Sequence, residues 1–96
     1  SHIKRKRFSV VDVLTGHGIG RNLHEEPAVL NWGRPGEGQK LEAGMVLAIE
    51  PMVAAGQGAV IQHDDDSFRT ADGSLTAHFE HTVAVTARGP RILTAL

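Results

Sequence analysis

Apolar positions along the chain follow the spacing of strands rather than of helices. Short apolar runs alternate with polar residues or end at glycine and proline, and almost no segment shows the three-to-four-residue repeat of an amphipathic helix. The predicted strands cover residues 8–14, 45–55, 59–63, 67–70, 75–86 and 91–93. This pattern predicts a mostly antiparallel sheet of about five strands, with any helix layer over one face supplied from elsewhere.

Glycine and proline interrupt the pattern at three places. Residues 16–20 hold three glycines in five residues, which predicts a turn whose backbone adopts positive φ or closely approaches another segment. Residues 25–44 hold prolines and glycines around a short apolar patch, which predicts a long ordered loop. Within residues 45–55, Pro51 cannot donate to a sheet ladder, so the strand should be bulged or edge-like beside Glu50.

Length and composition narrow the class of protein. The 96 residues amount to about one small domain, expected to span residues 8–96. Residues 1–7 are polar and basic, and we interpret them as a flexible or cloning-derived start, or as the end of an upstream helix. A net charge of −1 gives no reason to expect nucleic acid, and no apolar run reaches the ~20 residues of a membrane span. A soluble, cytoplasmic protein without nucleic-acid or membrane partners is expected.

Two segments present a metal-binding type of side chain on an unusual backbone. The chain has no cysteine, so any metal site must use histidine and carboxylate ligands. His17 lies between Gly16 and Gly18, which leaves its imidazole free of neighbouring bulk, as a metal ligand or proton shuttle requires. Glu50 lies in an apolar strand, where a carboxylate is costly to bury unless it is paired or coordinates a cation. The alternatives are an ordinary turn histidine and a surface-facing glutamate.

A third candidate, Glu80, lies in the predicted strand 75–86. Alternation divides this strand into two faces, with Phe79, His81 and Val83 on one and His78, Glu80 and Thr82 on the other. The alternative for Glu80 is a solvated strand face. Taken together, one histidine and two strand-borne carboxylates match a site for Mn, Fe, Co or Zn, and bridging carboxylates would suit a two-metal centre.

Four motifs occur in a specific order along the chain. They are Gly16-His17-Gly18-Ile19-Gly20, His24-Glu25-Glu26-Pro27, Glu50-Pro51-Met52 and Glu80-His81-Thr82. In this order and at this spacing they resemble the C-terminal half of the type I methionine aminopeptidases, over roughly residues 8–94. The last two motifs favour this family over the related proline-specific aminopeptidases and prolidases.

The resemblance implies a fold, a reaction and roles for the site residues. The fold would be α+β, with a curved antiparallel sheet that forms half of a pita-bread (creatinase/aminopeptidase) fold. The reaction would be the metalloprotease removal of the initiator methionine from the N-terminus of nascent proteins, with two divalent ions (Co, Mn, Fe or Zn). His17, Glu50 and Glu80 would be metal ligands, with Glu80 bridging both ions and Glu50 also acting as general base or proton shuttle. His24 would be catalytic and substrate-binding, donating to the scissile carbonyl or the tetrahedral intermediate, whereas His81 is interpreted as structural or supporting.

The resemblance covers one half of the family's site. In the family two aspartates and a further histidine come from the N-terminal half, and neither Asp12 nor residues 64–66 fit the motif of those aspartates. We therefore expect a truncated half that alone holds at most one metal ion weakly and is inactive or weakly active. Its expected partners are a peptide N-terminus and either the missing N-terminal half or a second copy of the chain.

Two departures from the family concern the methionine pocket. Leu23 stands where family members often carry an aromatic residue, and residues 64–67 lack a tryptophan that the family usually has there. Both changes affect the expected shape of the pocket but not the metal ligands. The alternative function is a non-catalytic pita-bread-like module that binds peptides or proteins.

Overall fold

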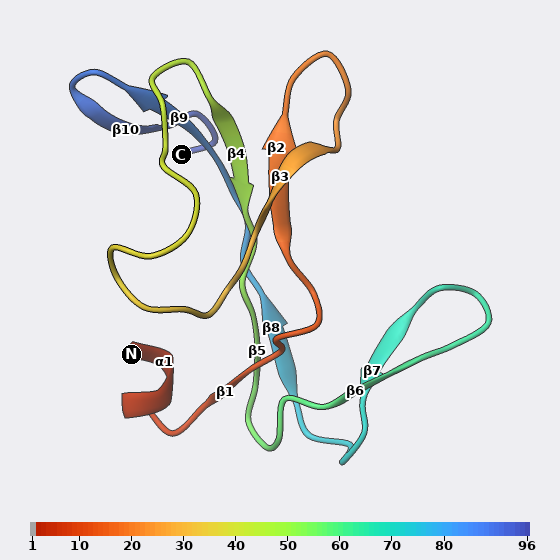
Figure 1. Ribbon diagram of the computed structural model, residues 1–96. Coiled ribbons are helices and arrows are strands. Elements are labelled where there is room, and N and C mark those ends of the chain that lie inside the picture. The colour runs from red at the N-terminus through yellow and green to blue at the C-terminus, as the bar shows by residue number, and fades with distance from the viewer. Residues whose placement is uncertain (1) are drawn as a thin grey trace.

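Strands dominate the computed structural model, which describes residues 2–96 (Figure 1). The only helix in this range is the four-residue α1 (His2–Arg5), and no helix there is long and apolar enough to cross a membrane. The strands are β1 (Ser9–Val10), β2 (Gly16–Ile19), β3 (Glu25–Val29), β4 (Val46–Ile49), β5 (Met52–Ala54), β6 (Val60–Gln62), β7 (Phe68–Thr70), β8 (Thr76–His78), β9 (His81–Thr86) and β10 (Gly89–Ile92).

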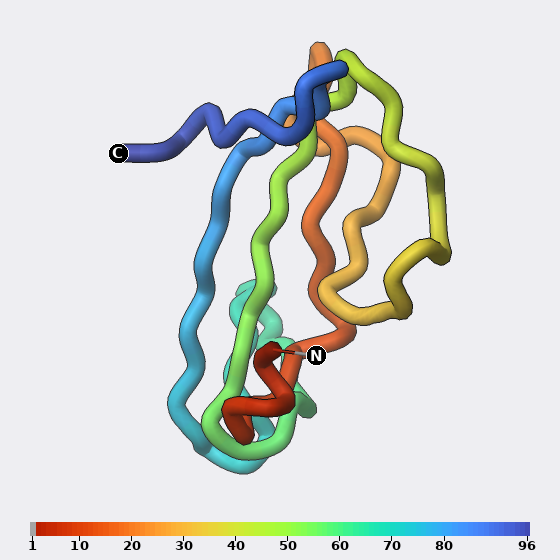
Figure 2. Tube along the Cα trace, turned by 90° about the vertical axis from the view of Figure 1, so that its left-hand side faces the viewer, coloured from red at the N-terminus to blue at the C-terminus, as the bar shows by residue number. Residues whose placement is uncertain are grey.

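Every strand pair is antiparallel, as predicted. A five-stranded sheet has the order β10-β9-β4-β2-β3, a three-stranded sheet has the order β1-β5-β8, and β6 pairs with β7 in a separate hairpin. β4 pairs with β9 and β5 with β8, so two long segments run side by side through both sheets (Figure 2). The helix layer that such a sheet requires is not found among the described residues, in which α1 alone is helical.

Both long segments are interrupted, and the interruptions lie opposite each other. One falls between β4 and β5 at residues 50–51, and the other between β8 and β9 at residues 79–80. Ile49 pairs with His81 and Met52 with His78, which sets the two gaps side by side. The interruption at Pro51 confirms the sequence prediction, but the single strand predicted over residues 75–86 is wrong at its middle. Because Pro51 has no N–H to donate, the ladder cannot continue through this point.

Residues 16–20 mostly form a strand, where a turn was predicted. β2 lies between β3 and β4. A Cβ on Gly16 would overlap the carbonyl oxygen of Ala48, and one on Gly18 would overlap that of Glu26. None of the three glycines in residues 16–20 has a positive φ. The close approach to another segment is confirmed, and the turn is wrong, because glycine here makes room for two neighbouring backbones.

The predicted bounds of one loop and one strand need correction. Glu25–Val29 forms β3 because it pairs with β2, so the predicted loop 25–44 starts later, after this strand. In the predicted strand 8–14 only β1 pairs; Val11 is buried and donates its N–H to Met52, and the chain then turns, with Val13 67% exposed. The strands predicted near residues 59–63 and 67–70 are confirmed as β6 and β7.

The core is small and is built around the paired long segments. Its buried apolar residues are Val11, Leu47, Ala48, Ala54 and Val83. Several large apolar side chains remain exposed, including Leu23 at 68% and Phe79 at 67%. With few large side chains buried, we expect a modest free energy of unfolding for the chain alone.

Asp72 joins two loops beside the three-stranded sheet. Its carboxylate accepts the backbone N–H of Gln57 at 2.8 Å and that of Ser74 at 3.0 Å. The hydrogen bond from Gln57 is the main cause that lowers the pKa of Asp72 from 3.8 to about 2, and Ser74 adds to it. A depressed carboxyl pKa stabilises the fold above pH 3.8, and this contribution is lost as the pH falls towards 2.

We therefore expect Asp72→Asn to lower the thermal unfolding temperature at pH 6 by more than it does near pH 2. The measurement is circular dichroism melting between pH 2 and pH 6. Asp64→Asn is the matched control, because Asp64 accepts no hydrogen bond within residues 2–96. A difference between wild type and Asp72→Asn that stays constant over this pH range would contradict the assignment.

Candidate metal site

The His17 imidazole is fixed by its own strand. His17 lies in β2, and its side chain is 15% exposed. Its Nδ1 lies 2.9 Å from the carbonyl oxygen of Gly18, and since a carbonyl only accepts, the proton of this bond belongs to Nδ1. In the neutral ring Nε2 therefore presents a lone pair, the form in which histidine binds metals.

The Glu50 carboxylate lies between two imidazoles. Its Oε1 is 3.1 Å from Nε2 of His17, and its Oε2 is 3.2 Å from Nε2 of His78. The Glu50 side chain is 14% exposed, so it is neither a solvated surface group nor fully buried. The surface-facing alternative for Glu50 does not hold in this structure.

Glu80 completes a three-residue cluster. One ligand atom from each of His17, Glu50 and Glu80 lies within 4.8 Å of the others. The three side chains come from β2 and from the two opposed interruptions, which free Glu50 and Glu80 from the regular alternation of a strand. The three residues proposed as ligands from the sequence are thus brought together, although they lie in three separate segments.

The hydrogen-bonding pattern of this cluster fits a cation. Nδ1 of His17 is occupied by Gly18, so Nε2 of the neutral ring and Oε1 of an ionised Glu50 are two acceptors only 3.1 Å apart. Two acceptors attract each other only when a proton or a cation lies between them. Imidazole nitrogen and carboxylate oxygen are ligands that suit Zn, Mn, Fe and Co.

His24 lies beside the cluster rather than in it. Its ring centroid is 4.1 Å from that of His17, with the two planes tilted by 41°. The residue is exposed, in the turn between β2 and β3. This position suits a group that faces a ligand bound at the cluster from the solvent side.

His78 has no role in the sequence prediction, yet it contacts Glu50. Strand alternation placed His78 on the same face as Glu80, but it gave no indication that Glu50 lies opposite His78. His81, which was interpreted as structural or supporting, has Nδ1 2.9 Å from the hydroxyl of Thr94, which also accepts the N–H of Thr82 at 3.1 Å. These contacts tie the C-terminal segment to β9.

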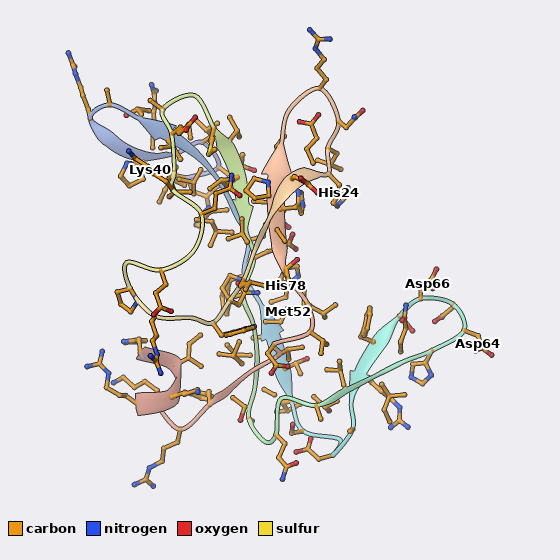
Figure 3. The ribbon with its side chains drawn as sticks, viewed as in Figure 1. His24, Lys40, Met52, Asp64, Asp66 and His78 are labelled. Carbon is orange, nitrogen blue, oxygen red and sulfur yellow. The ribbon has the colours of Figure 1, made fainter. Side chains whose placement is uncertain are left out.

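The acidic residues 64–66 lie away from the cluster. Asp64 and Asp66 are at the tip of the β6–β7 hairpin, away from His24 and His78 (Figure 3). Between them, Asp65 accepts the N–H and the hydroxyl of Ser67, and the hydroxyl is the main cause that lowers the pKa of this carboxyl. The acidic turn therefore has a local structural role, as expected of residues that do not match the family's aspartate motif.

Comparison with known proteins places these observations in a family. The sequence model for Metallopeptidase family M24 matches residues 1–87. The chain is 55% identical over 96 residues to the methionine aminopeptidase of Clostridium perfringens, covering 99% of this chain and 39% of the relative. It is 47% identical over 95 residues to methionine aminopeptidase 1 of Bacillus subtilis, covering 98% of this chain and 38% of the relative.

Solved structures give the same result for the fold. The crystal structure of methionine aminopeptidase from Thermotoga maritima is similar with a TM-score of 0.92 and 46% identity, covering 98% of this chain and 38% of that one. The structure from Rickettsia prowazekii gives a TM-score of 0.94 and 44% identity, with 98% and 39% covered. These matches confirm the predicted antiparallel sheet of the pita-bread family. The chain spans about two fifths of the length of the curated relatives it matches.

Proposed function

Because this chain belongs to metallopeptidase family M24, we propose that it forms part of the active site of a methionine aminopeptidase. The substrate would be the N-terminus of a nascent protein, from which the initiator methionine is removed. The observation that carries the proposal is the convergence of His17, Glu50 and Glu80 within 4.8 Å of one another. The names of the similar proteins from Clostridium perfringens and Bacillus subtilis support the choice of reaction.

The three clustered residues would hold the metal. His17 would be a metal ligand through Nε2, Glu50 would be a ligand through its carboxylate, and Glu80 would be the carboxylate shared by two ions. Divalent cations of the Co, Mn, Fe or Zn type would supply Lewis-acid polarisation of the scissile carbonyl and a water that is nucleophilic at neutral pH. The chain alone would hold at most one ion weakly, since three protein ligands leave a second ion without enough donors.

Glu50 would transfer protons during the reaction, and His24 would stabilise the negative charge that develops on the substrate. Glu50 has a second oxygen that does not face His17, so this carboxylate can accept or return a proton while it remains anchored. His24 lies over the ring of His17 and would donate a hydrogen bond to the substrate carbonyl oxygen as negative charge develops there.

A non-catalytic module that binds peptides or proteins is the less favoured function. Such a module has no need for three metal-binding side chains that converge from separate segments, and all three are kept here. We place the protein in the cytoplasm, where the N-termini of nascent proteins first become accessible.

The reaction can be tested with a chimera. The N-terminal part of the Clostridium perfringens relative, which this chain does not match, would be fused before residue 1, and hydrolysis of Met-Ala-Ser would be followed with Mn(II) or Co(II). We expect the chimera to release methionine at a rate that the 96-residue chain alone does not reach.

Glu80→Gln in the chimera should lower kcat/KM by at least about 100-fold, since a bridging ligand is lost. Glu37→Gln is the matched control, because Glu37 is exposed in the loop after β3. A folded, metal-loaded chimera that does not hydrolyse Met-Ala-Ser would refute the proposed reaction.

A further inference from the structure

We propose that His78 is a positioning residue that orients the Glu50 carboxylate toward the metal-binding cluster. The inference rests on the proposed function, because it assumes that His17, Glu50 and Glu80 hold a divalent cation. It adds to the three-residue cluster a supporting residue that would act on the metal through Glu50 alone.

The two oxygens of Glu50 face different partners. Oε1 lies 3.1 Å from His17, within the cluster, whereas Oε2 lies 3.2 Å from Nε2 of His78. At 3.2 Å, Nε2 of His78 lies within hydrogen-bonding distance of Oε2, and since an ionised carboxylate only accepts, Nε2 would be the protonated donor of this hydrogen bond. A hydrogen bond at Oε2 would fix the rotation of the carboxylate and keep Oε1 directed toward the cluster, where a cation could bind.

His78 does not belong to the three-residue cluster. The group whose ligand atoms all lie within 4.8 Å of one another contains His17, Glu50 and Glu80, but not His78. An Nε2 that carries a hydrogen and donates a hydrogen bond to Oε2 has no lone pair to offer a metal. The geometry therefore supports a hydrogen-bond donor behind a ligand, which is the arrangement that commonly orients ligands in metal sites.

The backbone sets this contact in place. His78 is the last residue of β8, and it pairs with Met52, the first residue of β5. The N–H of Phe79 donates to the carbonyl oxygen of Pro51 at 3.2 Å, which closes the ladder next to Glu50. Glu80 follows His78 by two residues, in the break between β8 and β9. The end of β8 and this break therefore provide one proposed ligand and the support for another.

The His78 side chain is more exposed than that of Glu50. His78 lines a small pocket of about 100 Å³ together with Met52 and Ala77, and Figure 3 shows His78 and Met52 close together. Its side chain is 46% exposed, compared with 14% for Glu50, so the imidazole lies between the carboxylate and solvent. Removing the ring would leave Oε2 of Glu50 to water and free to rotate.

The test is isothermal titration of the intact chain with Mn(II). We expect His78→Ala to weaken Mn(II) binding by about 10-fold, the lower end of the effect of losing a partner behind a metal ligand. His78→Gln should restore most of the affinity, because its amide N–H can donate to the same Glu50 oxygen. His63→Ala is the matched control, since His63 is an exposed histidine in the β6–β7 hairpin whose hydrogen bonds are made by its backbone.

Three outcomes would overturn the proposal. His78→Ala could bind Mn(II) as tightly as wild type, or it could lose no more affinity than His63→Ala. Alternatively, His78→Gln could fail to restore binding while the Co(II) absorption spectrum of His78→Ala changes, which would make His78 a ligand. Circular dichroism melting of each variant shows whether a loss of affinity reflects unfolding, and the Gln variant preserves the test if Ala does not fold.

A readout without metal separates this inference from the proposed function. In the metal-free chain, Glu50→Gln should shift the imidazole ¹⁵N resonances of His78, whereas Glu37→Gln should leave them unchanged. If the chimera neither binds Mn(II) nor hydrolyses Met-Ala-Ser but the shift is seen, the proposed function fails while the contact between His78 and Glu50 stands. If wild type binds Mn(II) and neither the shift nor the affinity loss appears, the inference on His78 fails alone.

Discussion

Glu50→Gln is expected to lower the Mn(II) affinity of the chain by more than about 100-fold, since loss of a mere supporting partner already costs about 10- to 100-fold. The substitution keeps the size of the side chain but removes the negative charge that faces His17. The amide N–H of glutamine can donate a hydrogen bond to Nε2 of His17. This hydrogen bond would take the place of a cation between the two side chains. Isothermal titration with Mn(II) measures the change.

Thermal unfolding of the metal-free protein provides the matched comparison. Because glutamine satisfies both neighbouring imidazoles, Glu50→Gln should unfold at the wild-type temperature or above it when no metal is present. Added Mn(II) should raise the unfolding temperature of wild type but not of the variant. Equal stabilisation of both proteins by Mn(II) would show that the metal binds somewhere other than at Glu50.

The second large effect concerns the fold. Gly16→Ala should destabilise the chain by about 3 kcal/mol, the upper end of the usual cost of overpacking a well-packed site. The new methyl group would overlap the carbonyl oxygen of Ala48 and lie 3.2 Å from Cβ of Val29, so β4 and β3 would both have to move. Urea denaturation followed by circular dichroism measures the loss.

Gly20→Ala is the matched control for this prediction. A Cβ at Gly20 would meet only the carboxylate end of Glu25, a flexible side chain that can turn away. It should therefore change the free energy of unfolding by much less than Gly16→Ala. Similar losses for the two variants would mean that the glycines serve the backbone of β2 itself rather than its approach to neighbouring strands.

The sequence predicts the strands and the grouping of His17, Glu50 and Glu80 better than the conformation of the glycine-rich segment. Pro51 marks the end of β4 because it removes a ladder donor, which is a local property that a sequence pattern contains. The three glycines of residues 16–20 are ambiguous from sequence, because glycine serves a turn and a close strand approach equally well. Only the pairing of β2 with both β3 and β4 shows which of the two is used.

The contact between His78 and Glu50 could not be predicted for a different reason. Alternation along residues 75–86 gives the face of His78 but not what lies opposite, since the register of two strands far apart in sequence is set by tertiary contacts. The break at residues 79–80 is equally non-local, because nothing in Phe79 or Glu80 prevents a continuous strand. It appears opposite the break that Pro51 imposes, at the position where the partner strand lacks its N–H.

The opposed interruptions also decide where the chain can tolerate changes in length. The pairs Ile49 with His81 and Met52 with His78 fix the position of Glu80 relative to Glu50 from both sides of the break. Insertions or deletions in the β6–β7 hairpin leave these pairs untouched, so the segment between the two carboxylates can gain or lose residues freely. A single residue added between His78 and His81 would instead shift the carboxylate along the ladder and separate it from its partners.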